Sequence, residues 1–138
     1  DKAEEIIKHS VDVALKNFDE DNINISRSYM WYGKALEGNG KPERGIYYLS
    51  KAYQLRLKEF GEKNKLTLST QNQLGKCLLS AKQFAEAENH LLRSYTLFKE
   101  MLGDKDETTK KALASLVELY KNWGKKNKVD YYTKLVAG

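Results

Sequence analysis

Large apolar residues recur every three or four positions along most of this chain, the spacing that places them on one face of an α-helix. The pattern predicts helices over residues 3–18, 25–38, 43–60, 66–80, 84–102, 107–122 and 127–136. The third of these should carry Leu49, Ala52, Tyr53 and Phe60 inward. No stretch alternates apolar and polar residues for long enough to form a strand. The sequence therefore predicts an all-α protein of about seven helices.

The predicted helices are separated by short polar or glycine-containing breaks. Pro42 stands where a helix can begin without losing a needed N–H group. Gly61 and Gly103 each follow a predicted helix, at the position that favours a positive φ. Because the breaks are short, we expect successive helices to pack antiparallel as hairpins.

The pattern repeats when the chain is shifted against itself by 42 positions. Under this shift the following pairs coincide: Gly33 and Gly75, Leu36 and Leu78, Leu49 and Leu91, Tyr53 and Tyr95, Gly61 and Gly103. A fixed period of about 20 to 50 residues is typical of solenoids, in which each unit buries its apolar face on the next. The matches predict an α-solenoid of stacked helix pairs.

The repeat divides the chain into units within one domain, residues 1–138. Residues 1–20 are interpreted as the second helix of a truncated repeat, because Leu15 and Phe18 align with Leu57 and Phe60. Three further units follow at 25–62, 66–104 and 107–138. Since the first residue is Asp1 rather than Met, we expect this chain to be part of a longer protein.

The repeating residues resemble the tetratricopeptide repeat family. The resemblance is carried by Leu74-Gly75-x-x-Leu78, by Phe84-x-x-Ala87-x-x-x-Leu91-x-x-Ser94 and, one unit earlier, by Tyr32-Gly33-x-x-Leu36. The 42-residue period and the run 102–106 resemble the long variant found in kinesin light chains. The closing run 116–125 is similar to the end of repeat arrays attached to bacterial serine/threonine kinases. The resemblance implies a right-handed solenoid that binds proteins.

In such a solenoid the first helices of successive units line a concave groove. Residues opposite the packing positions should face it, and the candidate partner-binding residues are Arg27, Met30, Lys34, Asn72, Lys76, Lys111 and Lys121. Leu79, Glu37 and Glu118 fall on the same stripe. Because basic residues outnumber acidic ones there, the resemblance implies an extended, acidic peptide as partner, with Asn72 holding its backbone. The plain alternative is that these lysines only keep the helices solvated.

Composition and charge limit the classes of partner and the location that we expect. The net charge of +5 permits an acidic partner but lacks the dense basic patch of a nucleic-acid binder. No apolar span is long enough to cross a membrane. A lone cysteine, Cys77, cannot form an intramolecular disulfide, which fits a cytoplasmic location. A second function class stays open: a structural spacer or self-association unit that dimerises through the ends of the array.

The sequence offers no catalytic, metal or cofactor site. His9 and His90 are isolated, without partners at metal-ligand spacing. Cys77 aligns with core positions of the other units and is expected to act as a small buried hydrophobe. The segment 38–41 joins two helices and lacks the strand that precedes a phosphate-binding loop. We therefore expect a protein that is not an enzyme and binds no cofactor.

Overall fold

Seven α-helices follow one another in the computed structural model, which describes residues 2–138. They are α1 (Lys2–Asn17), α2 (Ser26–Gly38), α3 (Pro42–Phe60), α4 (Lys65–Ser80), α5 (Phe84–Leu102), α6 (Glu107–Trp123) and α7 (Lys126–Ala137). A short 3-10 turn, η1 (Ile23–Ile25), leads into α2, and no described residue lies in a strand. Each expected helix is present with its bounds shifted by at most one residue, which confirms the all-α prediction.

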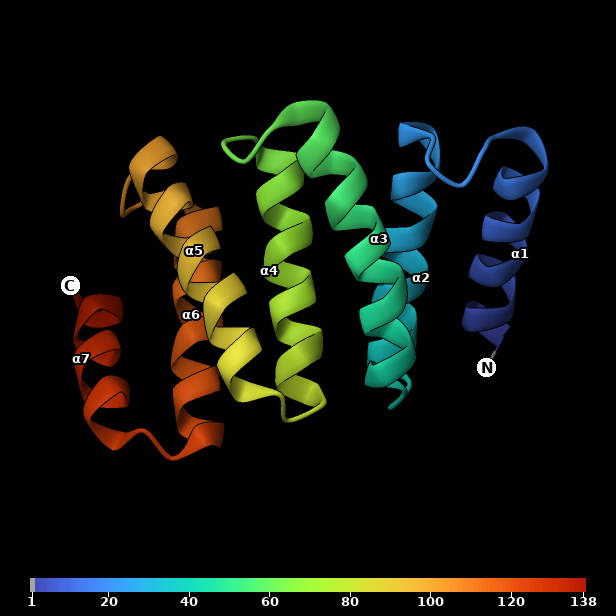
Figure 1. Ribbon diagram of the computed structural model, residues 1–138. Helices are drawn as coiled ribbons and strands as arrows, with labels where there is room; N and C mark the ends of the chain where they lie inside the picture. Colours follow the sequence, from blue (N-terminus) through green and yellow to red (C-terminus); the bar gives the residue numbers. More distant parts are fainter. Residues whose placement is uncertain (1) are drawn as a thin grey trace.

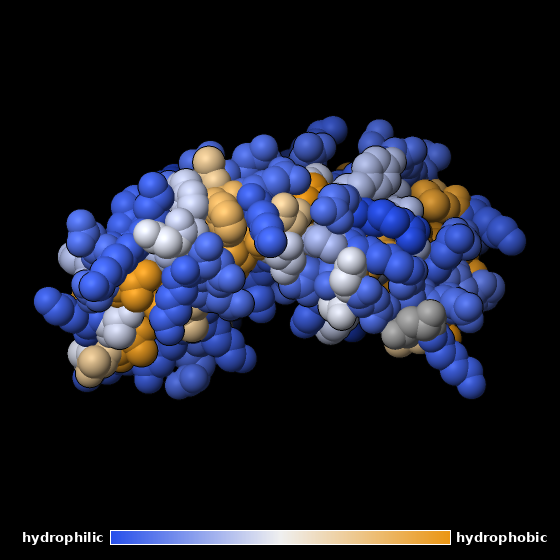
Figure 2. Space-filling model, turned by 90° about the horizontal axis from the view of Figure 1, so that it is seen from below, coloured by the Kyte–Doolittle hydropathy of each residue, from blue (hydrophilic) through white to orange (hydrophobic). Residues whose placement is uncertain are grey.

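The helices form two layers of a curved row (Figure 1). Within the described residues, α2 touches α4 and α4 touches α6, whereas no two of α1, α3, α5 and α7 touch each other. The layer of α2, α4 and α6 is therefore the tighter, inner layer of the curve. Figure 2, seen along the helices, shows the arched outline that results. The first and last helices lie at opposite ends of the row (Figure 1).

Helix pairs approach closely at the repeated glycines. Gly33 of α2 faces Leu49 of α3, and Gly75 of α4 faces Leu91 of α5, so a side chain at either glycine would collide with the leucine. Leu49 and Leu91 are fully buried. The 42-residue shift thus joins positions with the same packing role.

A capping residue also recurs every 42 positions, before η1, α4 and α6. Asn22, Asn64 and Asp106 each accept a hydrogen bond from the backbone N–H two residues later, at 2.9, 2.8 and 2.8 Å. An amide or carboxylate oxygen at this position satisfies an N–H group that the helix itself leaves unpaired. The same capping chemistry therefore starts α4, α6 and the turn η1, whereas α2 itself begins after Ile25, which makes no side-chain capping bond.

One prediction about the core is wrong. Phe60, predicted to point inward, is 42% exposed. It is the last residue of α3, and Gly61 with φ of 81° turns the chain away immediately afterwards. No neighbouring helix covers this final turn as it covers Leu49.

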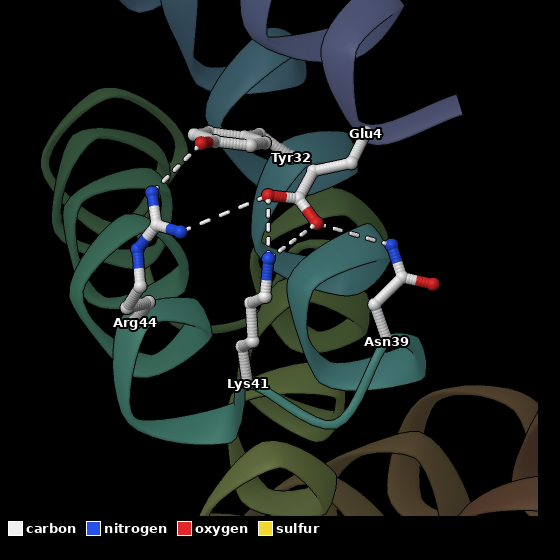
Figure 3. Close-up of polar contacts among 5 residues, drawn as sticks. All are labelled: Glu4, Tyr32, Asn39, Lys41 and Arg44. Atoms are coloured by element: carbon white, nitrogen blue, oxygen red, sulfur yellow. Dashed lines mark hydrogen bonds and ion pairs between the residues drawn. The ribbon is translucent and has the colours of Figure 1, made fainter. Parts of the chain in front are cut away.

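Polar contacts of Glu4 hold α1 against the first complete helix pair (Figure 3). Lys41 Nζ donates to both carboxylate oxygens of Glu4 at 3.2 Å, and Asn39 Nδ2 donates to one at 3.2 Å. Arg44 forms an ion pair with Glu4 at 3.7 Å and donates to the hydroxyl of Tyr32 at 3.0 Å. The hydrogen bond from Lys41 is the main reason that the pKa of Glu4 lies below its ordinary value.

Candidate binding surface

The inner helices expose a row of side chains on the concave side of the arch. We define the concave face by the exposed or half-buried residues Arg27, Trp31, Lys34, Ser69, Asn72, Lys76, Lys111, Ala114 and Glu118. Their helices α2, α4 and α6 pack in sequence against one another. Positions 42 residues apart, such as Lys34, Lys76 and Glu118, therefore form rows across the face.

The candidate residues differ in how open they are. Arg27, Lys34, Lys111 and Lys121 are exposed, whereas Met30, Asn72 and Lys76 are half-buried. Lys34 and Lys76 lie at equivalent positions on the two contacting helices α2 and α4. The structure thus places these two cations on one surface, as the repeat register requires.

Three candidates have surroundings that the sequence did not indicate. The sulfur of Met30 lies 3.3 Å from Nη1 of Arg56, so Met30 belongs to the seam between α2 and α4. Asn72 Oδ1 accepts a hydrogen bond from Ser94 at 3.3 Å, which ties this amide to α5. Lys121 is equivalent to Leu79, and because Leu79 faces α6, Lys121 faces away from α4 toward the end of the array.

Leu79 itself corrects the sequence-based placement. It was expected on the groove stripe, yet it is only 7% exposed and belongs to the main core. The reason is that α6 packs against α4 on this side. A pattern within one helix does not reveal which side the next unit will cover.

An exposed aromatic residue stands beside the predicted cations. Trp31 is 43% exposed, and Nζ of Lys34 lies 5.1 Å from the centre of its ring. This cation–π contact joins two residues of the concave face. Tryptophan is enriched among the residues that contribute most to protein interfaces, which makes Trp31 a candidate anchor.

The charges of the concave face are unbalanced. Arg27, Lys34, Lys76 and Lys111 make no ion pair with any described carboxylate. Some cations of the outer helices are paired, namely Lys51 with Glu20, Arg93 with Glu62 and Lys128 with Glu88, whereas others such as Lys58 and Lys126 pair with no described carboxylate. Of the acidic residues on the same stripe, Glu37 accepts a hydrogen bond from Ser80 at 2.8 Å. The concave face therefore presents a net positive charge to solvent.

Arg56 is a residue that the sequence interpretation missed. It comes from the outer helix α3, is only 5% exposed, and donates hydrogen bonds to Ser26 of α2 and Thr70 of α4. Desolvation by burial lowers its pKa, and the positive charge of Arg27 adds to this effect. The signal that could have found it is the repeat itself, because a shift of 42 places Arg56 on Phe98.

Of the residues considered for chemistry, His90 is half-buried and Cys77 is buried. Nδ1 of His90 lies 3.3 Å from Nε2 of Gln71, its ring packs edge-on against Tyr53, and burial lowers its pKa. Cys77 is fully buried, and its thiol donates to the carbonyl oxygen of Pro42 at 3.2 Å. Within residues 2–138, no cluster of His, Cys, Asp and Glu is arranged to hold a metal ion.

Comparison with known proteins supports the resemblance. A family model described as the tetratricopeptide repeat matches residues 24–100. The fold is similar to the nearly identical TPR-like repeats of a proposed kinesin light chain from Podosopora anserina, with a TM-score of 0.85 and 17% identity. A variant of those repeats that carries one substitution gives a TM-score of 0.81 and 19% identity.

The structural alignments cover nearly all of this chain but only part of the solved structures. Each alignment to the two solved structures includes 97% of this chain and 62% of the other, so the chain spans less than two-thirds of their length. No curated protein matches the sequence. None of the helices in residues 2–138 combines the length and the apolar character needed to cross a bilayer.

Proposed function

Because this chain belongs to the tetratricopeptide repeat family, whose members are in general non-catalytic protein-interaction modules, we propose that its concave face binds an extended, acidic segment of a partner protein. The observation that carries the proposal is the set of unpaired cations Arg27, Lys34, Lys76 and Lys111 on one face. An extended chain laid across α2, α4 and α6 would meet them in turn.

The spacing of the inner helices supports an elongated ligand. Consecutive inner helices touch, so cations at equivalent positions follow one another across the face. A peptide in extended form rises about 3.3 Å per residue, so acidic side chains on one side of it recur at about 7 Å. Charge complementarity of this kind steers association and fixes the register of the bound chain.

Trp31 gives the proposed surface a second type of contact. Its exposed ring could pack on an apolar side chain of the partner while Lys34, held over the ring, meets a neighbouring carboxylate. We propose that partner segments combine acidic residues with a large apolar one. The side-chain nitrogen of Asn72 donates no hydrogen bond to any described residue. It is therefore available to donate one to a backbone carbonyl of the peptide.

The test is selection of peptides from a displayed random library, followed by affinity measurement by fluorescence anisotropy. Selected peptides should be acidic, and the double variant Lys34→Glu with Lys76→Glu should bind them at least about tenfold more weakly. The matched control reverses Lys58 and Lys126, which are exposed on the outer helices. Equal effects of the two double variants would contradict the proposal.

A second candidate function is self-association through the ends of the array. It is favoured by exposed apolar residues on the terminal helices: Ile6 at 65% and Leu15 at 41% on α1, and Val136 at 58% on α7. A homodimer would cover these side chains. Size-exclusion chromatography with light scattering should then show dimers that disappear in Ile6→Asp or Val136→Asp, whereas a monomer at all concentrations would rule this candidate out.

A further inference from the structure

Arg56 carries a buried positive charge to the floor of the concave face. It starts from the outer helix α3, but its Nε donates to Ser26 Oγ of α2 at 3.1 Å and its Nη1 to Thr70 Oγ1 of α4 at 2.8 Å. Because its partners come from both inner helices, the guanidinium lies in the seam between α2 and α4. Only 5% of the residue is exposed.

The groups around Arg56 do not neutralise it. Its partners are two hydroxyl groups and the sulfur of Met30 at 3.3 Å, and it makes no ion pair with any described carboxylate. No described residue accepts a hydrogen bond from its Nη2. Arg27 of the concave face adds a second positive charge close enough to disfavour the first. A buried charge without a counter-ion is costly to the folded state.

The next unit shows that the fold does not need this charge. A shift of 42 residues turns Arg56, Ser26 and Thr70 into Phe98, Leu68 and Ala112. These three are 2%, 0% and 1% exposed, so the equivalent positions in the seam between α4 and α6 hold buried apolar side chains. Both seams serve the same packing purpose, and only the first contains a cation. Packing therefore does not explain the presence of Arg56.

We propose that the seam between α2 and α4 is a binding subsite for one acidic side chain of the partner protein, with Arg56 beneath the carboxylate and Arg27 at its edge. The planar guanidinium offers paired donors that match the two oxygens of a carboxylate. Met30, which lies against Arg56, is flexible enough to move aside as the carboxylate enters. This subsite rests on the proposed function, since it lies on the same face.

The seam suits a protein carboxylate better than a nucleic-acid backbone. Recognition of a nucleic acid uses many phosphate contacts along a dense basic surface. Here Arg27 and Arg56 come together at one point, while Glu118 lies on the same face at α6. A single deep cation fits one acidic side chain at a fixed register of the bound chain.

The test uses fluorescein-labelled octaglutamate and octaglutamine, with binding to the full 138-residue chain followed by fluorescence anisotropy. Arg56→Met should weaken binding of octaglutamate at least about tenfold, as expected for a desolvated charged contact. Arg93→Met is the matched control, because it removes one arginine from the exposed surface of the outer helix α5. It should change the affinity less than about twofold, as is usual for a charge remote from the ligand. Octaglutamine, which carries no charge on its side chains, should bind neither the wild-type protein nor the two variants.

The outcomes separate the subsite from the proposed function. If Lys34→Glu with Lys76→Glu weakens octaglutamate binding while Arg56→Met and Arg93→Met behave alike, the subsite is wrong and the binding face stands. If none of these variants differs from wild type, the face itself is wrong. An octathymidylate that binds with the same dependence on Arg56, in place of octaglutamate, would also overturn the proposal.

A measurement on the wild-type protein guards against a variant that fails to fold. The ¹⁵N–¹H signal of Arg56 Nε, assigned by its loss in Arg56→Lys, should shift in a saturable way as octaglutamate is added. The Nε signal of Arg93 should stay in place at the same concentrations. An unmoved Arg56 signal under conditions where octaglutamate is bound would contradict the subsite.

Discussion

Gly75 and Leu91 face each other so closely that a β-carbon on the glycine would lie 2.6 Å from Cγ of the leucine. The same distance, 2.6 Å, separates such an atom on Gly33 from Cγ of Leu49. Non-bonded carbon atoms of two side chains do not approach this closely in folded proteins. The close spacing of α2 with α3 and of α4 with α5 therefore requires a residue without a side chain at these positions.

Replacing Gly75 by Leu should destabilise the protein by about 1 to 3 kcal/mol, because the new side chain must displace Leu91. Changing the adjacent Lys76 to Ala should alter the free energy of unfolding by no more than about 0.5 kcal/mol, as for most surface positions. Urea unfolding followed by circular dichroism measures both. Similar losses for the two variants would mean that the helix faces have been assigned incorrectly.

Transplanting the apolar seam of the second unit into the first should stabilise the protein. The triple variant Arg56→Phe, Ser26→Leu and Thr70→Ala copies Phe98, Leu68 and Ala112, which fill the equivalent seam. We expect a gain of about 1 to 4 kcal/mol in the free energy of unfolding, since a desolvated charge is replaced by packed apolar groups. Thermal and urea unfolding measure it. A loss of stability would show that the two seams differ in shape as well as in polarity.

Acidification should weaken the attachment of α1. The pKa of Glu4 in the folded protein lies below its ordinary value of 4.5, mainly because of the hydrogen bond from Lys41. The unfolded chain therefore binds a proton more readily, so the stabilisation by Glu4 is complete above that value and is lost as the pH falls below it. Urea midpoints of wild type and Glu4→Gln should differ at about pH 7 and converge as the pH falls through the lowered pKa of Glu4, by the same linkage.

Glu5→Gln is the control for that experiment, because Glu5 is exposed on the same turn of α1. Its midpoints should follow those of wild type at every pH. A gap between wild type and Glu4→Gln that stays constant down to the lowest pH would argue against the role of the Glu4 carboxylate.

Cys77 should react with thiol reagents only when the protein opens. Burial raises the pKa of its thiol to about 12, so almost no thiolate is present at neutral pH, and the side chain is inaccessible. Labelling by an aromatic disulfide reagent should be slow in buffer and fast in urea. A cysteine at exposed Ser69, in a Cys77→Ala background, should react at once. Rapid reaction of Cys77 in buffer would contradict the packing of α4 against α3.

Much of the fold could be predicted because the repeated residues determine contacts within a helix or between neighbouring helices. The 42-residue shift joins Gly33 with Gly75 and Leu49 with Leu91, and these are the residues whose packing sets the distance between helices. Helix bounds followed from apolar spacing and from Pro42. Such features depend on a residue's own helix and its nearest partner, so a single sequence displays them.

The candidate site was less predictable because its residues depend on contacts between units. Leu79 is covered by α6, and Met30 lies against Arg56 from another helix. Neither contact can be read from the helical pattern of one segment. Arg56 was missed for a related reason: an arginine is ordinarily placed on the surface, and only its alignment with Phe98 indicates a buried position.

The two layers of the arch have a mechanical consequence. The outer helices of the described chain do not touch one another, and successive units are joined by the contacts of α4 with α2 and α3 and of α6 with α4 and α5. Small rotations at these contacts between units would change the curvature of the whole row. A ligand that bridges two inner helices would restrict these rotations. The seam at Arg56 lies at one such contact, between α2 and α4.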